Sequence, residues 1–337
     1  MSKYDPIESP DATTIFPYHD LTPPTPADVY KARSIVRRYL PRTPLVRSEA
    51  LSDETGADVY LKREDTLPTG AFKVRGGVTL GHQLSDEFRD TGLIAASTGN
   101  HGQSVAYAGR TFDVPVTIAV PEKPNLEKVA AMETFGATVV EHGVDYDEAR
   151  EWVEERAAEE GYRYVHSANE PELIAGVGTA GIEILEDLPE VDIVVCPVGG
   201  GSSAAGYCLS VGALGDAEVI GIQSEAADAT YRAYHEDHLD PSEQVSTMAE
   251  GIASRVPFAL TMDIMRERLA DIRLVSEDTI QQTIQDMLTN ERLIVEGASA
   301  AALGAVQKMN VSGSTIVVPI SGRNLSTTKL HHAVGDG

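Results

Sequence analysis

Strand-like and helical segments alternate along this chain from about residue 57 onwards, and this alternation restricts the fold more than any other feature. Such an order predicts an α/β protein with parallel sheets and helices on both faces. The expected strands lie at 59–62, 94–96, 115–120, 137–140, 191–196, 218–222 and 315–320, and the expected helices at 101–112, 125–135, 145–159, 173–187, 202–213 and within 277–308. We also expect a helix to begin after Pro26. The polar, proline-rich residues 1–25 show no periodicity and are expected to form an arm without regular secondary structure.

Three of the expected strands run into glycine-containing loops, within residues 95–102, 196–203 and 318–324. In open α/β sheets, ligands bind beyond the carboxyl ends of strands, so these loops can converge on one cleft. The second loop, Gly199-Gly200-Gly201-Ser202-Ser203, opens a helix, and its backbone N–H groups suit a phosphate. Taken alone, such a turn also fits a dinucleotide site or tight packing.

Composition excludes several classes of function. The chain of 337 residues is 42% hydrophobic, which allows a sizeable core and suggests two domains. The 52 acidic and 27 basic residues give a net charge of −25, which argues against nucleic acid or an anionic membrane as partner. No apolar run has the length of a membrane span, and the start lacks the apolar core of a signal peptide, so we expect a cytoplasmic protein.

The acidic residues are spread along the chain, and we interpret this as the salt-adapted surface of a halophilic protein. The alternative is an ordinary acidic cytosolic protein. The two cysteines, Cys196 and Cys208, lack metal-ligand spacing and are expected to be buried thiols.

Lys73 is the candidate catalytic residue. It follows the apolar pair Ala71-Phe72 within a glycine-containing segment. A lysine held against apolar surface loses hydration, so its pKa falls and its neutral amine becomes a nucleophile for carbonyl groups. For a lone lysine the more common alternative is a solvated side chain at a helix start.

The whole run KREDTLPTGAFKVRG at 62–76 resembles the lysine segment of the fold-type-II pyridoxal-phosphate (PLP) enzymes, the group of threonine/serine dehydratases and serine racemase. The resemblance implies a tryptophan-synthase-beta-like fold with two open, mostly parallel sheets. It implies a large PLP-binding domain of residues 1–80 and 165–337, and a small substrate-loop domain of residues 81–164. It also implies pyridoxal 5'-phosphate as cofactor, an amino acid as small-molecule substrate, and a homodimer.

The resemblance further assigns site residues to this chain. Lys73 would carry the cofactor and act as base, with Thr98 as a second catalytic candidate. The cofactor would be bound by Phe72, Lys73, Asn100, Gly199, Gly200, Gly201, Ser202, Ser203, Gly251 and Ser321. The substrate carboxylate would be bound by Ser97, Thr98, Asn100 and His101.

Several positions depart from the family pattern, among them Arg323 in the last glycine-containing loop. Ser202 replaces the fourth glycine of the phosphate loop, and Thr98 stands where serine racemases carry their second acid/base serine. The β-methyl of Thr98 restricts χ1, which disfavours two-base racemisation. Gln223 stands where metal-binding members carry a glutamate, and Ala229 occupies a later acidic position, so we expect no metal. The alternative is that Glu225 or Asp228 compensates for the two lost ligands.

The resemblance implies a PLP-dependent threonine/serine ammonia-lyase that acts by α,β-elimination. It also implies that Ser321 binds the pyridine nitrogen. A serine does not keep that nitrogen protonated, and a weaker electron sink suits elimination better than long-lived carbanions. The alternatives are a serine or aspartate racemase, a dehydratase of a hydroxyectoine-pathway amino acid, and a β-replacing synthase. Two alternatives do not belong to these enzyme classes: a catalytically inactive ligand-binding protein and a dinucleotide oxidoreductase.

Overall fold

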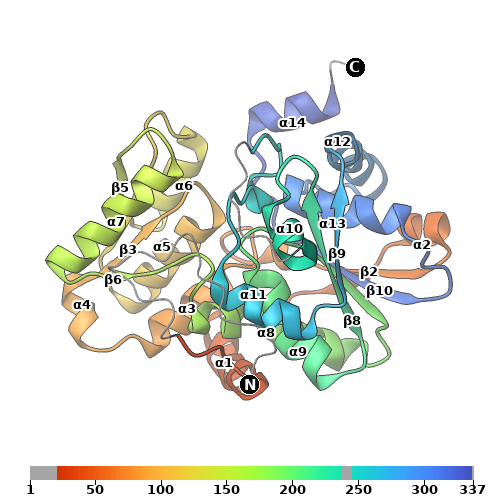
Figure 1. Cartoon of the computed structure of the whole chain (residues 1–337), viewed down its shortest axis with the longest axis horizontal. Coiled ribbons are helices and arrows are strands. Elements are labelled where there is room, and N and C mark those ends of the chain that lie inside the picture. Colours follow the sequence, from red (N-terminus) through yellow and green to blue (C-terminus); the bar gives the residue numbers. More distant parts are fainter. Residues whose placement is uncertain (1–20, 237–244, 336–337) are drawn as a thin grey trace.

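The computed structural model describes residues 21–236 and 245–335. Most of the expected N-terminal arm, residues 1–25, therefore lies outside the described residues. Within them, two separate sheets and their helices form two halves of the molecule (Figure 1).

The larger sheet has six strands in the order β1-β2-β10-β7-β8-β9, and the smaller has four in the order β5-β4-β3-β6. Only β1 pairs antiparallel, with β2, and all other strand pairs in these sheets are parallel. The strands are β1 Leu45–Arg47, β2 Asp58–Lys62, β3 Leu93–Ala96, β4 Val116–Val120, β5 Thr138–Glu141, β6 Arg163–Tyr164, β7 Ile193–Pro197, β8 Glu218–Ser224, β9 Asp271–Val275 and β10 Thr315–Pro319. The prediction of two open, mostly parallel sheets is confirmed.

Helices cover both faces of each sheet. One face of the larger sheet packs on a core with residues of α1, α8, α9 and α11, and its other face on a core with residues of α2, α12, α13 and α14. The smaller sheet lies between α3, α5 and α6 on one face and α7 on the other. The α-helices are α1 Pro26–Tyr39, α2 Glu49–Thr55, α3 Val74–Gln83, α4 Glu87–Thr91, α5 Asn100–Phe112, α6 Leu126–Thr134, α7 Tyr146–Glu160, α8 Pro171–Asp187, α9 Ser202–Leu214, α10 Ala229–Glu236, α11 Ala259–Arg268, α12 Glu277–Asp286, α13 Gly297–Lys308 and α14 Thr327–Val334. Short helical turns are η2 Glu64–Thr66, η3 Glu250–Ile252 and η4 Met287–Glu291.

Capping explains where several helices begin. Thr25 and Asp28 form a capping box before α1, with Pro26 at the first helical position. The side chain of Asp145 caps α7 by accepting a hydrogen bond from the backbone N–H of Glu148. These are local sequence signals, whereas α5, α8 and α9 begin without a side-chain cap. The predicted helix starts agree with the observed ones to within a few residues.

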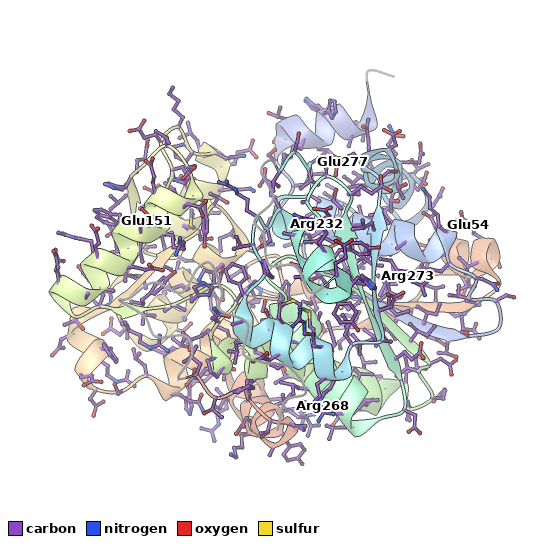
Figure 2. All side chains as sticks on the ribbon, in the orientation of Figure 1. Glu54, Glu151, Arg232, Arg268, Arg273 and Glu277 are labelled. Carbon is purple, nitrogen blue, oxygen red and sulfur yellow. The ribbon has the colours of Figure 1, made fainter. Side chains whose placement is uncertain are left out.

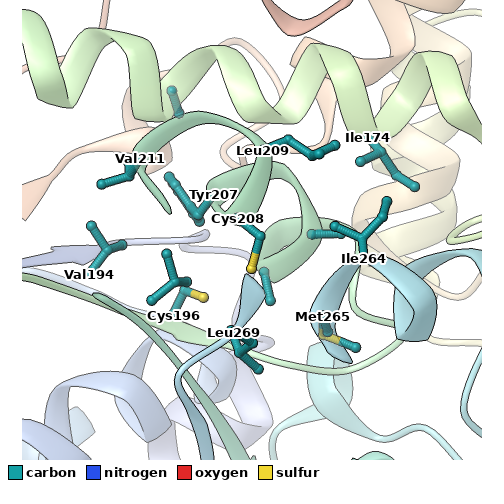
Figure 3. Packing of buried hydrophobic residues seen from close by; sticks show 14 of the residues in the cluster. Ile174, Val194, Cys196, Tyr207, Cys208, Leu209, Val211, Ile264, Met265 and Leu269 are labelled. Atoms are coloured by element: carbon teal, nitrogen blue, oxygen red, sulfur yellow. The ribbon is translucent and has the colours of Figure 1, made fainter. Parts of the chain in front are cut away.

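Both cysteines are buried in the core between β7 and α9 (Figure 3). Cys196 lies on β7 and Cys208 on α9, beside the buried Tyr207. Burial raises the pKa of the Cys208 thiol to about 12 and raises that of Cys196 well above its ordinary value. The prediction of buried thiols is confirmed.

Acidic side chains occur on both halves of the surface. Glu151 on α7 and Glu54 on α2 are exposed at opposite sides of the molecule (Figure 2). No helix within residues 21–236 and 245–335 is long and apolar enough to cross a membrane.

Candidate active site

A cavity of about 440 Å³ lies between the two halves of the molecule. All three glycine-containing loops reach it, because each follows the carboxyl end of a strand: β3, β7 or β10. The predicted site residues that line this one cavity are Phe72, Lys73, Ser97, Thr98, Asn100, His101, Gly199, Gly200, Gly201, Ser202, Ser203, Gly251 and Ser321. The structure therefore brings together residues that are far apart in the sequence.

Lys73 lies immediately before α3, on the wall of this cavity. Its Nζ donates hydrogen bonds to the backbone oxygen of Ser167 and to Oγ of Ser202, each at 2.7 Å. Nζ also lies 5.5 Å from the centre of the Phe72 ring. Burial lowers the pKa of Lys73 from its ordinary value to about 8, because the surrounding protein displaces the water that stabilises the ammonium form.

A buried ionic network holds the segment around Lys73. Arg75, fully buried on α3, donates hydrogen bonds to Glu64 at 2.6 Å and to Glu183 of α8 at 2.9 Å. Lys62 at the end of β2 donates to the same Glu183 at 2.8 Å. Burial alone would raise the pKa of Glu183, but Arg75 and Lys62 outweigh it and lower that pKa to about 2. Paired charges thus connect three elements around the start of α3.

The glycine loop after β7 leaves no room for side chains. A Cβ atom at Gly199 would approach the backbone oxygen of Gly251 to 2.5 Å, and one at Gly200 would approach the side chain of Ala168 to 2.9 Å. Gly201 has a φ of 86° and caps the N-terminus of α9. Residues 199–203 line the cavity at the N-terminus of α9, and a glycine-containing helix start of this kind suits an anion.

The loop after β3 leads into α5. The hydroxyl oxygen of Ser97 accepts hydrogen bonds from the backbone N–H groups of Gly99 and Gly102, at 3.1 and 2.8 Å. The ring of His101 donates from Nε2 to the carbonyl oxygen of Val165 at 2.8 Å, since a carbonyl can only accept. Burial is the main reason that the pKa of His101 falls to about 3, so the ring is neutral over the physiological pH range.

Glu296 is a cavity residue that the sequence analysis missed. It directly precedes α13 and is buried, with 8% of its surface exposed. Its carboxylate accepts hydrogen bonds from Nδ2 of Asn100, at 2.9 and 3.1 Å, and from Oγ of Ser321, at 3.1 Å. Burial raises the pKa of Glu296 above its ordinary value, against the effect of these hydrogen bonds. An acidic residue at the end of the apolar run Leu-Ile-Val, directly before a helix, was the only available sequence signal.

Ion pairs line the cavity, and some of them join the two halves. Lys128 of α6 pairs with Glu250 of η3 across the cavity, and Lys329 of α14 pairs with the same Glu250 within the larger half. Arg255 pairs with Asp147 of α7 at 3.0 Å. All five residues line the cavity, and none was predicted from the sequence.

Gln223, at the position expected to have lost a metal ligand, is fully buried on β8. Its amide oxygen accepts a hydrogen bond from the backbone N–H of Tyr231 at 2.9 Å. Within the part of the chain that the structure describes, no three His, Cys, Asp or Glu side chains are grouped so that they could hold a metal ion.

The profile of the pyridoxal-phosphate-dependent enzymes matches residues 36–322. The chain belongs to this family. It is 35% identical over 312 residues to the L-threonine ammonia-lyase of Thermotoga maritima, a match that covers 92% of this chain and 78% of that protein. It also resembles the structure of the processed form of threonine deaminase isoform 2 from Solanum lycopersicum, with a TM-score of 0.87, 30% identity and coverage of 99% and 95% of the two chains. Maize serine racemase shares the fold, with a TM-score of 0.87 at 23% identity over 93% of this chain and 97% of that one.

The cavity fits the family's cofactor, pyridoxal phosphate. A cofactor of this kind needs an amine for its aldehyde and a site for its phosphate, and Lys73 and the glycine loop are hydrogen-bonded to each other through Ser202. At Gly199 and Gly200 a Cβ atom would clash with neighbouring residues, so the loop can take this path beside the cavity only with glycine at these positions. The family match and the similar proteins confirm the resemblance to the fold-type-II PLP enzymes that was noted in the sequence.

Proposed function

We propose that this protein is a PLP-dependent ammonia-lyase that converts L-threonine or L-serine to a 2-oxo acid and ammonia. The observation that carries the proposal is the position of Lys73, an amine with a lowered pKa, beside a glycine loop in the cavity. The related L-threonine ammonia-lyase and threonine deaminase support the same activity.

The proposed roles follow from the cavity's chemistry. The backbone N–H groups of residues 199–203 and the hydroxyls of Ser202 and Ser203 would hold the phosphate. Asn100 would bind the phenolic oxygen of the cofactor and Ser321 its ring nitrogen, and Phe72 and Gly251 would be the other residues that hold the cofactor. The substrate carboxylate is bound at the N-terminus of α5 by the loop residues Ser97, Thr98, Asn100 and His101.

Lys73 is the proposed base. When bound, pyridoxal phosphate accepts the electrons left on Cα after a proton is removed. The amine of Lys73 takes this Cα proton, and the bond from Cβ to the hydroxyl oxygen breaks. The proton removed from Cα balances the one that the leaving hydroxyl takes up, so elimination releases one water molecule and no net proton. The released enamine is then hydrolysed to the 2-oxo acid and ammonia.

Elimination is favoured over racemisation by Thr98 and Ser321. Racemisation needs a second acid/base on the face opposite Lys73, and the branched side chain of Thr98 is restricted there. The neutral Ser321 leaves the ring a weaker electron sink than an aspartate would. A serine or aspartate racemase, or a dehydratase of a hydroxyectoine-pathway amino acid, is the alternative activity.

One incubation tests the proposal. The purified protein with PLP is incubated separately with L-threonine and L-serine, and the products are analysed by a 2-oxo-acid assay and by chiral chromatography. We expect 2-oxo acid to form much faster than the D-amino acid. Accumulation of D-serine ahead of pyruvate would favour the racemase, and a protein that remains colourless with added PLP would refute the whole assignment.

We also propose the large domain of residues 1–80 and 165–337, the small domain of residues 81–164, a homodimer and a cytoplasmic location. The two sheets support the domain division, because the smaller one uses strands between residues 93 and 164.

The net charge of −25 supports the proposal of a halophilic protein, because salt would screen the repulsion between its acidic residues. Equal thermal stability in dilute buffer and in molar KCl would refute the halophilic interpretation.

A further inference from the structure

A chain of hydrogen bonds connects the three segments that surround the cavity. Asn324 donates from Nδ2 to the backbone oxygen of Thr69, at 2.9 Å, and to Oδ1 of Asn100, at 2.7 Å. Asn100 in turn donates from Nδ2 to Glu296, to which Ser321 also donates. The chain therefore runs from the Lys73 segment, through the start of α5, to the loop after β10.

The partners in this chain fix the orientation of both amides. The carbonyl of Thr69 can only accept, so the atom of Asn324 that faces it is the NH₂ group. The same NH₂ group faces Asn100, which must therefore present its amide oxygen to Asn324. The NH₂ group of Asn100 then faces Glu296, and the carboxylate supplies the acceptor that it needs.

Ser321 depends on Glu296 in a similar way. Its Oγ lies 3.1 Å from Glu296 and 2.9 Å from Oγ of Ser299. Ser299 donates its hydroxyl proton to the backbone oxygen of Gly322. Ser321 is therefore the donor in its own contacts, and its hydroxyl proton can go to Glu296 or to Oγ of Ser299. The contact with Glu296 thereby fixes the position of Oγ of Ser321, from which the hydroxyl proton can turn to an acceptor in the cavity.

We propose that Glu296 is a positioning residue that orients Asn100 and Ser321 toward the cofactor ring. The proposal rests on the proposed function, because Asn100 and Ser321 are assigned there to the phenolic oxygen and the ring nitrogen. One buried carboxylate thus orients both Asn100, which is assigned to the phenolic oxygen, and Ser321, which is assigned to the ring nitrogen. Removing it leaves the NH₂ group of Asn100 without this acceptor and frees the hydroxyl of Ser321 to rotate.

The test measures cofactor affinity by absorbance titration of the unloaded protein with PLP. The variants are Glu296→Gln, which keeps the side-chain shape but replaces one acceptor by a donor, and Glu296→Ala. The matched control is Glu170→Gln, another buried carboxyl, which bonds to Arg163 at 2.8 Å and does not line the cavity. Thermal unfolding of each unloaded protein checks that it is folded.

We expect both Glu296 variants to lower the PLP affinity about tenfold or more, the effect of one lost hydrogen bond to a charged group, and Glu170→Gln to leave it within about twofold. The pH dependence of the bound cofactor's absorbance should also change in the Glu296 variants, because Ser321 then offers its proton differently to the ring nitrogen. A general structural role would lower the unfolding temperature without this spectral change.

A double-mutant comparison distinguishes positioning from direct contact. If Glu296 acts through its two partners, then Glu296→Ala should weaken PLP binding by less than about twofold in an Asn100→Ala, Ser321→Ala background. An equal loss in both backgrounds, or unchanged affinity and absorbance in the Glu296 variants, would overturn the inference while the proposed function stands. A wild-type protein that binds no PLP would overturn both.

Discussion

The ammonium nitrogen of Lys73 lies 2.7 Å from the hydroxyl oxygen of Ser202, the first residue of α9. Ser202, which replaces the family's fourth glycine, is thus in direct contact with Lys73, the proposed base. We predict that Ser202→Ala weakens PLP binding by roughly threefold to tenfold, the value of one neutral hydrogen bond. Absorbance titration measures this. Ser210→Ala, which removes a buried hydroxyl from the same helix outside the cavity, is the control and should bind PLP normally.

The lowered pKa of Lys73 predicts how cofactor capture depends on pH. Only the neutral amine can attack the aldehyde of PLP, and this form becomes dominant above a pKa of about 8. The rate of covalent capture should rise about tenfold per pH unit below pH 8 and level off above it, once Lys73 is deprotonated. An ordinary lysine would give a rise that continues to about pH 10. Stopped-flow absorbance across this range would decide between the two, and Lys73→Ala should show no linkage that borohydride can reduce.

Thr98→Ser tests why elimination is expected to exceed racemisation. Serine keeps the hydroxyl but removes the methyl that restricts χ1. We predict that the ratio of D-amino acid to 2-oxo acid formed from L-serine rises by roughly tenfold, a modest part of what a well-placed acid/base contributes. Chiral chromatography and the 2-oxo-acid assay give the two rates. An unchanged ratio would mean that the methyl of Thr98 does not limit reprotonation.

Arg75→Ala should destabilise the protein severely. It would leave Glu64 and Glu183 buried with too little positive charge, which costs about 3–5 kcal/mol. Urea unfolding followed by circular dichroism measures the change. The control is Arg273→Ala, which removes an exposed pair with Asp271 at the sheet edge and should alter stability little (Figure 2). A similar, small effect of both substitutions would contradict the stabilising role of the buried network.

Local signals made the elements around the cavity predictable. The expected helix at 202–213 is observed as Ser202–Leu214, and the expected strand at 315–320 as Thr315–Pro319. Both elements follow from apolar runs next to glycine-containing loops. Because loops at the carboxyl ends of parallel strands converge, we could also predict that Lys73 lies in one cavity with these loops.

Residues that depend on tertiary contacts could not be predicted in this way. Glu296 bonds to Asn100, 196 positions away in the sequence, and no spacing marks such a pair. The ion pair of Arg255 with Asp147 likewise exists only because the two halves of the molecule meet. The edge strand Asp271–Val275 is a different case: its alternation of charged and apolar residues is a local strand signal, although it was not among the expected strands.

Because Cys196 and Cys208 are buried, their reaction with a thiol reagent measures how often the surrounding core opens. These are the two cysteines of the chain, and both thiols are shielded and held in the unreactive protonated form (Figure 3). A thiol reagent can therefore modify them only when the core between β7 and α9 opens. The rate of labelling reports that opening directly, and it can be followed in dilute buffer, in concentrated salt and with PLP without introducing a probe into the chain.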